Sequence, residues 1–259
     1  MSKGRKGKDD VWDIAAEGWV DFVRTGRDYF RDCLNNPATF RLIGSVKGKI
    51  VLDLACGEGY NTRILARKGA KVTGVDRSKK LINLARTEER RERLGIRYRR
   101  TDANRLKGIS DNSFDLVTCF MALQDIEDYE GAVAEAARIL KRGGRFVFSI
   151  QHPCFEKLVV NGARISATEK YFDKIEYPIE WNMERLRRKL KTVSFHKTLT
   201  DYSLALAKSG LFISRLVEPQ PTWEAVRKHP SLKDELTRPQ SIIFESIKAN
   251  RISLTHNVS

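Results

Sequence analysis

The stretch VLDLACGEGYNT, residues 51–62, decides the fold of this chain because it joins an apolar run to a glycine-rich loop. A near-continuous apolar run is typical of a strand that is buried on both faces of a parallel sheet. A strand of this kind followed by Gly57 and Gly59 is typical of folds that hold a nucleotide at the carboxyl end of the sheet. The stretch therefore predicts a nucleotide-binding α/β fold and leaves open which nucleotide is held.

Apolar segments and helical patterns alternate outward from this stretch. Strands are expected at 49–56, 71–76, 96–102, 114–123 and 145–150, and helices at 61–69, 78–95 and 129–144. This alternation is typical of βαβ units, and it predicts a doubly wound parallel sheet with helices on both faces. Residues 11–45 and 199–210 are also expected to be helical, and 211–219 and 241–249 to form two further strands.

The alternation stops after Ile150. Residues 153–197 are rich in aromatic and charged side chains and contain no clear strand of the same series. An insertion at the carboxyl end of a strand lies over the ligand crevice. The predicted organisation is therefore a tail with cap helices (1–45), a core (46–152 and 198–259) and an inserted substrate lid (153–197).

The composition restricts the cellular location of the protein but does not identify its substrate. The 259 residues contain no apolar run long enough for a membrane span, and the basic N-terminus is not followed by the pattern of a secretory signal. The four cysteines form no CxxC pair, which favours reduced thiols, a cytoplasmic location and no metal site. The net charge of +15 is compatible with an RNA partner, and equally with the mixed-charge surface of a thermophile protein.

Three acidic residues indicate the ligand. Thr62 stands at the third glycine position of a dinucleotide loop, and Asp53 precedes that loop inside the strand, where it would oppose a pyrophosphate and suit an ammonium group. Asp76 ends the second strand, where a carboxylate accepts hydrogen bonds from both ribose hydroxyls. Asp102, with the Ala103 amide beside it, follows the third strand and suits adenine. S-adenosylmethionine, with the product S-adenosylhomocysteine, has these features.

The chain resembles class I S-adenosylmethionine-dependent methyltransferases, in particular the type 11, ubiquinone-methyltransferase-like group. The resemblance covers roughly residues 45–151 and is carried by VLDLACGEGYN, VTGVD, TDA, FDLVTCFMALQDI and ARILKRGGRFVFSI, in that order. It implies a Rossmann-like sheet of seven strands whose last strand, 241–249, is antiparallel. It also implies a cofactor site made of Asp53, Ala55, Cys56, Gly57, Gly59, Tyr60, Asn61, Asp76, Arg77, Asp102, Ala103 and Met121. Arg77 departs from the family, in which many members place an aliphatic residue, and its guanidinium is expected to stack on adenine.

Methyl transfer needs mainly positioning, with a base where the acceptor is a hydroxyl or a carbon acid. His152 follows the fifth strand and is the candidate base, although it would serve equally to cap the strand end. In the lid, Tyr171, Trp181 and His196 are predicted to line the substrate pocket. For His196 the alternative is a hydrogen bond that joins the lid to the core.

Three functions stay open at this point. The favoured one is O-, N- or C-methylation of a small molecule enclosed by the N-terminal helix and the lid. The second is methylation of tRNA or rRNA, with the basic run 86–100 as the contact surface, but no RNA-binding module and no NPPY-type motif after the fourth strand supports it. The third is a protein that holds the cofactor without turnover. The oligomeric state is left open.

Overall fold

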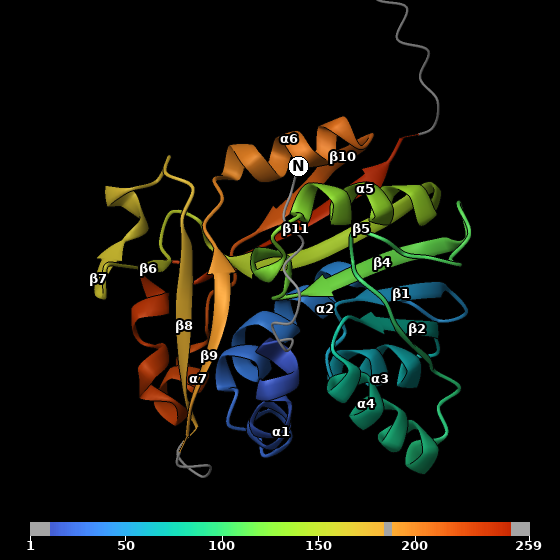
Figure 1. Ribbon diagram of the computed structural model, residues 1–259, viewed down its shortest axis with the longest axis horizontal. Coiled ribbons are helices and arrows are strands. Elements are labelled where there is room, and N and C mark those ends of the chain that lie inside the picture. Colours follow the sequence, from blue (N-terminus) through green and yellow to red (C-terminus); the bar gives the residue numbers. More distant parts are fainter. Residues whose placement is uncertain (1–10, 184–187, 250–259) are drawn as a thin grey trace, which may run out of the picture.

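The computed structural model describes residues 11–183 and 188–249. At its centre lies a seven-stranded sheet with the order β10-β11-β5-β4-β1-β2-β3 (Figure 1). Its strands are β1 (Ile50–Leu54), β2 (Lys71–Asp76), β3 (Arg97–Arg100), β4 (Phe114–Phe120), β5 (Leu140–Gln151), β10 (Leu211–Val217) and β11 (Ser241–Lys248). Strands β1 to β5 are parallel, whereas β11 is antiparallel to both β5 and β10. The predicted Rossmann-like sheet with an antiparallel last strand is confirmed.

Helices cover both faces of this sheet (Figure 1). The helices are α1 (Val11–Arg24), α2 (Asn36–Ile43), α3 (Tyr60–Arg67), α4 (Lys79–Glu92), α5 (Tyr129–Ile139), α6 (Leu199–Lys208) and α7 (Trp223–Lys228). Short helical turns are η1 (Arg31–Asn35), η2 (Leu123–Asp125), η3 (Ala167–Glu169), η5 (Pro230–Leu232) and η6 (Asp234–Leu236). Because successive residues of a strand point to opposite faces, Leu52 packs in the core beneath α5 and α6, and Val51 packs in the core beneath α2 and α3.

Local signals in the sequence account for most helix boundaries. The Ser78 hydroxyl accepts a hydrogen bond from Leu81 N at 3.1 Å and begins α4, as expected of an N-cap. The helix expected over 129–144 ends earlier, at Ile139. Residues 141–144 instead bulge out of the pairing between β4 and β5, which joins Phe114 to Leu140 and then Leu116 to Arg145.

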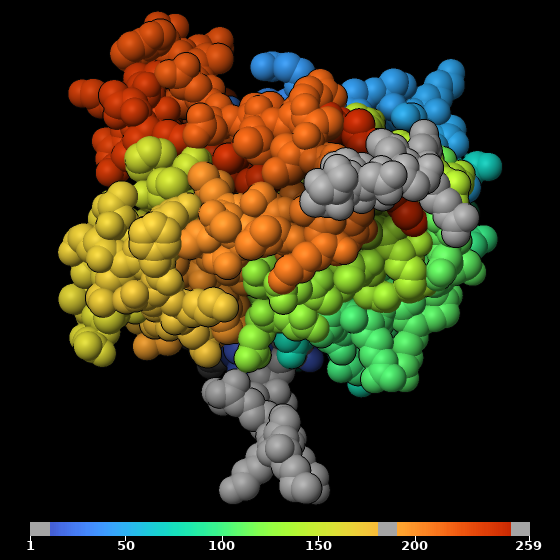
Figure 2. Space-filling view, turned by 90° about the horizontal axis from the view of Figure 1, so that it is seen from above, coloured from blue at the N-terminus to red at the C-terminus, as the bar shows by residue number. Residues whose placement is uncertain are grey.

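The inserted segment between β5 and α6 forms two hairpins that stand apart from the central sheet. One pairs β6 (Lys157–Val160) with β7 (Ala163–Ser166), and the other pairs β8 (Glu176–Met183) with β9 (Arg188–Phe195). Strand β9 packs against α1. In Figure 2 much of the insertion, in yellow, forms one end of the molecule beside the orange residues that follow it. The division of the chain into tail, core and lid stays a prediction.

Within residues 11–183 and 188–249, no helix has both the length and the apolar character needed to cross a lipid bilayer. The cytoplasmic location and the thermophilic origin stay predictions.

Candidate functional site

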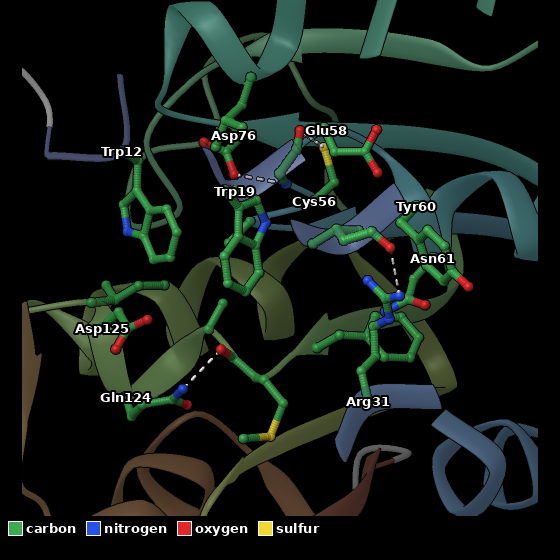
Figure 3. Close-up of a pocket in the computed structure, with 18 of the residues that line it drawn as sticks. Trp12, Trp19, Arg31, Cys56, Glu58, Tyr60, Asn61, Asp76, Gln124 and Asp125 are labelled. Carbon is green, nitrogen blue, oxygen red and sulfur yellow. Dashed lines mark hydrogen bonds between the residues drawn. The ribbon is translucent and has the colours of Figure 1, made fainter. Parts of the chain in front are cut away.

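A cavity of about 1150 Å³ lies at the carboxyl ends of the central strands. The loop after β1, the ends of β2 and β3, the turn after β4 and the N-terminal helices form its walls. All predicted cofactor residues except Gly59 line it: Asp53, Ala55, Cys56, Gly57, Tyr60, Asn61, Asp76, Arg77, Asp102, Ala103 and Met121. The structure thus brings residues from four strand ends to one site (Figure 3).

Asp53 is buried at the start of the glycine loop, where two threonine hydroxyls hold it. Thr62 Oγ1 donates to its Oδ2 at 2.6 Å, and Thr118 Oγ1 donates to its Oδ1 at 2.9 Å. Burial raises the pKa of Asp53 to about 7, against the opposing effect of these hydrogen bonds. Thr62, which occupies the position of the missing third glycine, therefore donates a hydrogen bond to the buried carboxyl group of Asp53.

Gly59 makes a tight backbone approach instead of lining the cavity. Its φ of +84° lies in the left-handed region, and it begins α3. A Cβ at this position would collide with the phenol of Tyr98, which packs beneath the loop. A glycine is required here for both reasons.

Asp76 fixes the loop from the neighbouring strand. Its Oδ2 accepts a hydrogen bond from Gly57 N at 2.9 Å, and its Oδ1 accepts one from Ser78 N at 2.8 Å. The side chain also borders the cavity, where the ribose of a nucleoside is expected. Beyond it, Arg77 Nε lies 4.0 Å from Asp102 Oδ1, and both side chains are exposed. This edge is the predicted location of adenine.

Helix α1 closes the cavity from above the glycine loop. Trp12, Trp19 and Phe22 line the cavity, and the two tryptophan rings meet edge to face with 5.4 Å between centroids. Glu58, which is buried in the loop, anchors the end of α1 through Arg24 (2.7 Å) and also binds Arg63 of α3 (3.0 Å). The aromatic side chains of α1 thus pack against the core and enclose the cavity.

The turn η1 places the guanidinium of Arg31, which is paired with Asp32, on the wall of the cavity. The Arg31 guanidinium lies 3.7 Å from the centroid of the Tyr60 ring (Figure 3). Beside them, Asn36 Nδ2 donates to Asn61 Oδ1 at 2.8 Å. The burial of Arg31 opposes its charge, but bonding to Asp32 and the charge of Asp28 raise its pKa above the usual value. A cation held here suits a carboxylate ligand.

The turn after β4 carries two cavity residues that the sequence analysis missed, Gln124 and Asp125. Figure 3 places them across the cavity from Arg31 and Tyr60. Burial raises the pKa of Asp125 to about 7, although a hydrogen bond from Ser194 and the charge of Lys197 oppose this shift. The available signal was a pair of polar residues that ends the apolar run FDLVTCFMAL.

Three of the predicted acceptor-side residues, His152, Tyr171 and His196, are not among the described residues that line this cavity. The His152 ring hydrogen-bonds Glu218 Oε1 at 2.9 Å and accepts from Cys154 N at 3.2 Å. His196 bonds the Glu156 carboxylate and the Tyr171 carbonyl. Both partners belong to the lid itself, so these bonds do not join the lid to the core. Tyr171 Oη accepts from Leu199 N at 3.0 Å. The side chain of Trp181 lies outside the described residues, and the roles of all four residues stay predictions.

The insertion contributes other residues to the cavity, namely Arg164, Ile179 and Glu180, and Gln151 of β5 also lines it. In the described part of the chain, no group of three or more His, Cys, Asp or Glu side chains is placed to hold a metal ion.

A doubly wound sheet with an antiparallel last strand, an acid after β2 and an aromatic cover over the glycine loop are features that this chain shares with class I S-adenosylmethionine-dependent methyltransferase domains. Residues 52–148 match the family model described as a methyltransferase domain.

The chain is similar to known methyltransferases both in sequence and in structure. The chain is 34% identical over 122 residues to a ubiquinone biosynthesis O-methyltransferase from Alkalilimnicola ehrlichii, covering 47% of this chain and 46% of that protein. It is 34% identical over 126 residues to a demethylmenaquinone methyltransferase from Tropheryma whipplei, covering 48% and 52%. The chain thus spans about half the length of these curated relatives. An S-adenosylmethionine-dependent methyltransferase from Mesorhizobium loti superimposes with a TM-score of 0.67 at 29% identity, covering 82% of this chain and 96% of that one.

Proposed function

We propose that this chain transfers the methyl group of S-adenosylmethionine to a small molecule that shares the cavity with the cofactor. The observation that carries the proposal is the size and cover of the cavity. Ligand pockets commonly measure about 300–1,000 Å³, and this cavity reaches about 1150 Å³. A space of this size beneath α1 and the β8–β9 hairpin has room for a cofactor and a second small molecule together.

The residues present fit the cofactor. Asp76 would receive the ribose hydroxyls, Asp102 the adenine amino group, and the backbone of the glycine loop would pass close to the nucleoside. Arg31 would pair with the carboxylate of the methionine end, and Asp53 would lie near its ammonium group. The sulfonium supplies an activated methyl group, so the protein's contribution is to hold the acceptor in line with it and to exclude water.

The contacts of the arginines in the basic run 86–100 also favour a small acceptor over RNA. Several of its arginines are already engaged within the protein: Arg86 donates to Tyr98 O, Arg99 to Lys107 O and Gly108 O, and Arg100 to Arg77 O. On α4, Arg91 pairs with Glu88 and lies 3.8 Å from Glu92. Such a surface resembles a solvated helix face more than a phosphate-binding stripe. The curated relatives are named for quinone-related small molecules, which supports the same choice.

Two measurements test the proposal. Calorimetry with S-adenosylhomocysteine and with NAD is expected to show binding of the first only, and tighter binding of NAD would contradict it. Transfer of a labelled methyl group is then compared between an extract of small metabolites and total unmodified RNA. Transfer to RNA that is lost when Arg90, Arg91 and Arg93 are neutralised, with a binding slope near about −0.7 per phosphate in a salt series, would overturn the choice of acceptor.

A further inference from the structure

The turn η2 holds a buried hydrogen-bond acceptor that has no protein partner. Gln124 is 5% exposed, and its Nε2 donates to Met121 O at 2.8 Å. This bond fixes which end of the amide is oxygen, and Oε1 accepts no hydrogen bond from any residue within the described ranges. Burying an unpaired acceptor costs about 1–3 kcal/mol. In Figure 3 the amide end of Gln124 is turned toward the cavity, so a ligand with a donor group would satisfy it.

Asp125 provides a second acceptor on the same wall. Its side chain is half-buried and lines the cavity, and its Oδ1 accepts a hydrogen bond from Ser194 Oγ of β9 at 2.8 Å. This wall lies across the cavity from Arg31, Tyr60 and Asn61, which hold the proposed methionine end of the cofactor (Figure 3). The position therefore belongs to the acceptor half of the cavity, and both side chains there offer oxygen atoms to a donor.

The wall is held rigidly from the core and from the lid. Met121 has a φ of +48°, and its backbone nitrogen donates to both Ser149 O and Ser149 Oγ at 3.0 Å. At the end of the insertion, Lys197 Nζ donates to Gln124 O at 3.1 Å. Residues on such a braced turn keep a fixed orientation toward the predicted position of the methyl group near Met121.

The surroundings of Asp125 suit a proton acceptor. The ionisable groups that face it come from several elements: Lys197, Glu156, Cys119, Tyr177 and Tyr202. Burial is the largest influence and raises the pKa of Asp125 to about 7, while Ser194 and Lys197 act in the opposite direction. A general base works best when its pKa lies near the operating pH.

We propose that Asp125 is the general base of the methyl transfer and that Gln124 orients the acceptor. The substrate class follows from this assignment: the nucleophile is an O–H or N–H group, and a second hydrogen-bond donor lies within reach of Gln124 Oε1. The assignment rests on the proposed function. Ser194 is a positioning residue, since it acts on the acceptor only through Asp125.

The step balances without any further reactant. A lone pair on the acceptor oxygen or nitrogen forms the new bond to the methyl carbon, and the electron pair of the carbon–sulfur bond stays on sulfur. The proton that the nucleophile loses moves to the free oxygen of Asp125. The neutral carboxyl group later returns this proton to solvent when the product leaves.

The test uses the 259-residue chain, S-adenosylmethionine with a ¹³C-labelled methyl group, and an extract of small metabolites that contains both its polar and its apolar fractions. The labelled product is expected to carry its methyl group on an oxygen or nitrogen that bore a proton. With that acceptor, Asp125→Asn is expected to reduce kcat by about 10²-fold to 10⁴-fold, while S-adenosylhomocysteine binding stays within about twofold. The matched control, Glu130→Gln, removes an exposed carboxylate of α5 and should leave kcat unchanged.

Two further variants separate catalysis from structure. Ser194→Ala removes a bond that lowers the pKa of Asp125, so the ascending limb of the pH–rate profile is expected to move to higher pH. Gln124→Leu is expected to raise KM for the acceptor by about tenfold. A product methylated on carbon or on an atom that never bore a proton, or full activity of Asp125→Asn, would overturn this assignment and leave the methyltransferase function standing. No labelled product from the wild-type protein would overturn both.

Discussion

Asp76 and Gly57 are joined by a hydrogen bond of 2.9 Å, from the backbone nitrogen of the glycine to Oδ2 of the carboxylate. The other oxygen, Oδ1, accepts from Ser78 N at 2.8 Å. One side chain thus fixes the glycine loop after β1 and the start of α4, and it borders the cavity between them. The residue proposed to bind the ribose also holds the loop in shape before any cofactor arrives.

Replacing Asp76 with Ala is therefore expected to have two effects. Loss of the charged acceptor should weaken S-adenosylhomocysteine binding by at least tenfold, since such a hydrogen bond contributes about 1.5–3 kcal/mol. The free energy of unfolding should also fall by about 1–3 kcal/mol, because two backbone donors lose their partner. Calorimetry and denaturant unfolding measure the two quantities.

Asp102→Ala is the matched comparison for Asp76→Ala. Asp102 is exposed, and its ion pair with Arg77 spans 4.0 Å, so only cofactor affinity should change. Normal cofactor binding by Asp76→Ala would mean that the ribose lies elsewhere.

The glycine loop gives a second prediction, which separates backbone conformation from crowding. Gly57→Ala and Gly59→Ala both place a Cβ at positive φ, at a cost of about 1–2 kcal/mol each. Open space surrounds a Cβ at Gly57, whereas one at Gly59 would meet the Tyr98 phenol. Gly59→Ala should therefore lower the free energy of unfolding by at least about 1 kcal/mol more than Gly57→Ala.

Tyr98→Phe tests the origin of this difference. The Tyr98 hydroxyl has no hydrogen-bond partner among the described residues, so its removal alone should cost little. In the Gly59→Ala background it should recover part of the lost stability, as measured by a double-mutant cycle. Strictly additive effects of the two substitutions would show that crowding by Tyr98 is not the cause.

The sequence predicted the cofactor residues that lie at the carboxyl ends of successive strands. The glycine loop, Asp76, Asp102 and Met121 each follow a strand, and parallel strands bring their carboxyl ends to one edge. Their meeting at one cavity therefore followed from the alternation of strands and helices.

The same reasoning was insufficient for His152. Gln151, the residue before it, lines the cavity. Side chains alternate between the two faces along an extended strand, so a shift of one residue turns the His152 ring away, toward Glu218. Contacts such as the stacking of Tyr29 on His229, with 5.0 Å between ring centroids, join segments far apart in the chain. No periodicity in the sequence encodes them.

A third prediction concerns the buried ion pairs that tie α1 to the loop. Glu58 is 2% exposed and bonds both Arg24 and the buried Arg63. Glu58→Gln removes the closer of the two carboxylates that pair with Arg63 and leaves only Glu92, at 3.7 Å, so we expect a loss of about 3 kcal/mol of stability. Arg24 is partly exposed, so Arg24→Ala should cost no more than about 1 kcal/mol. Equal losses in denaturant unfolding would contradict this ranking.

The last prediction links Asp53 to cofactor binding through pH. Burial raises the pKa of Asp53 to about 7 in the folded protein, from an ordinary value of 3.8. A carboxyl group with a raised pKa contributes to stability below its unfolded pKa, and that contribution is lost as pH rises through 7. The ammonium group of the cofactor favours the ionised form. Binding below pH 7 should therefore release a proton, and affinity should increase with pH until about 7.

Calorimetry at about pH 6, where an α-amino group stays protonated, measures this proton release from the dependence of the binding enthalpy on the ionisation enthalpy of the buffer. Asp53→Asn should abolish the dependence, whereas Asp125→Asn, which removes the other cavity carboxyl group with a pKa near 7, should retain it. In Asp53→Asn one threonine hydroxyl can still donate to the amide oxygen and the other can accept from the amide nitrogen. The variant is therefore expected to fold, which thermal unfolding verifies. Undiminished proton release by Asp53→Asn would mean that the ammonium group is held by another residue, because Asp53 would then not change its protonation on binding.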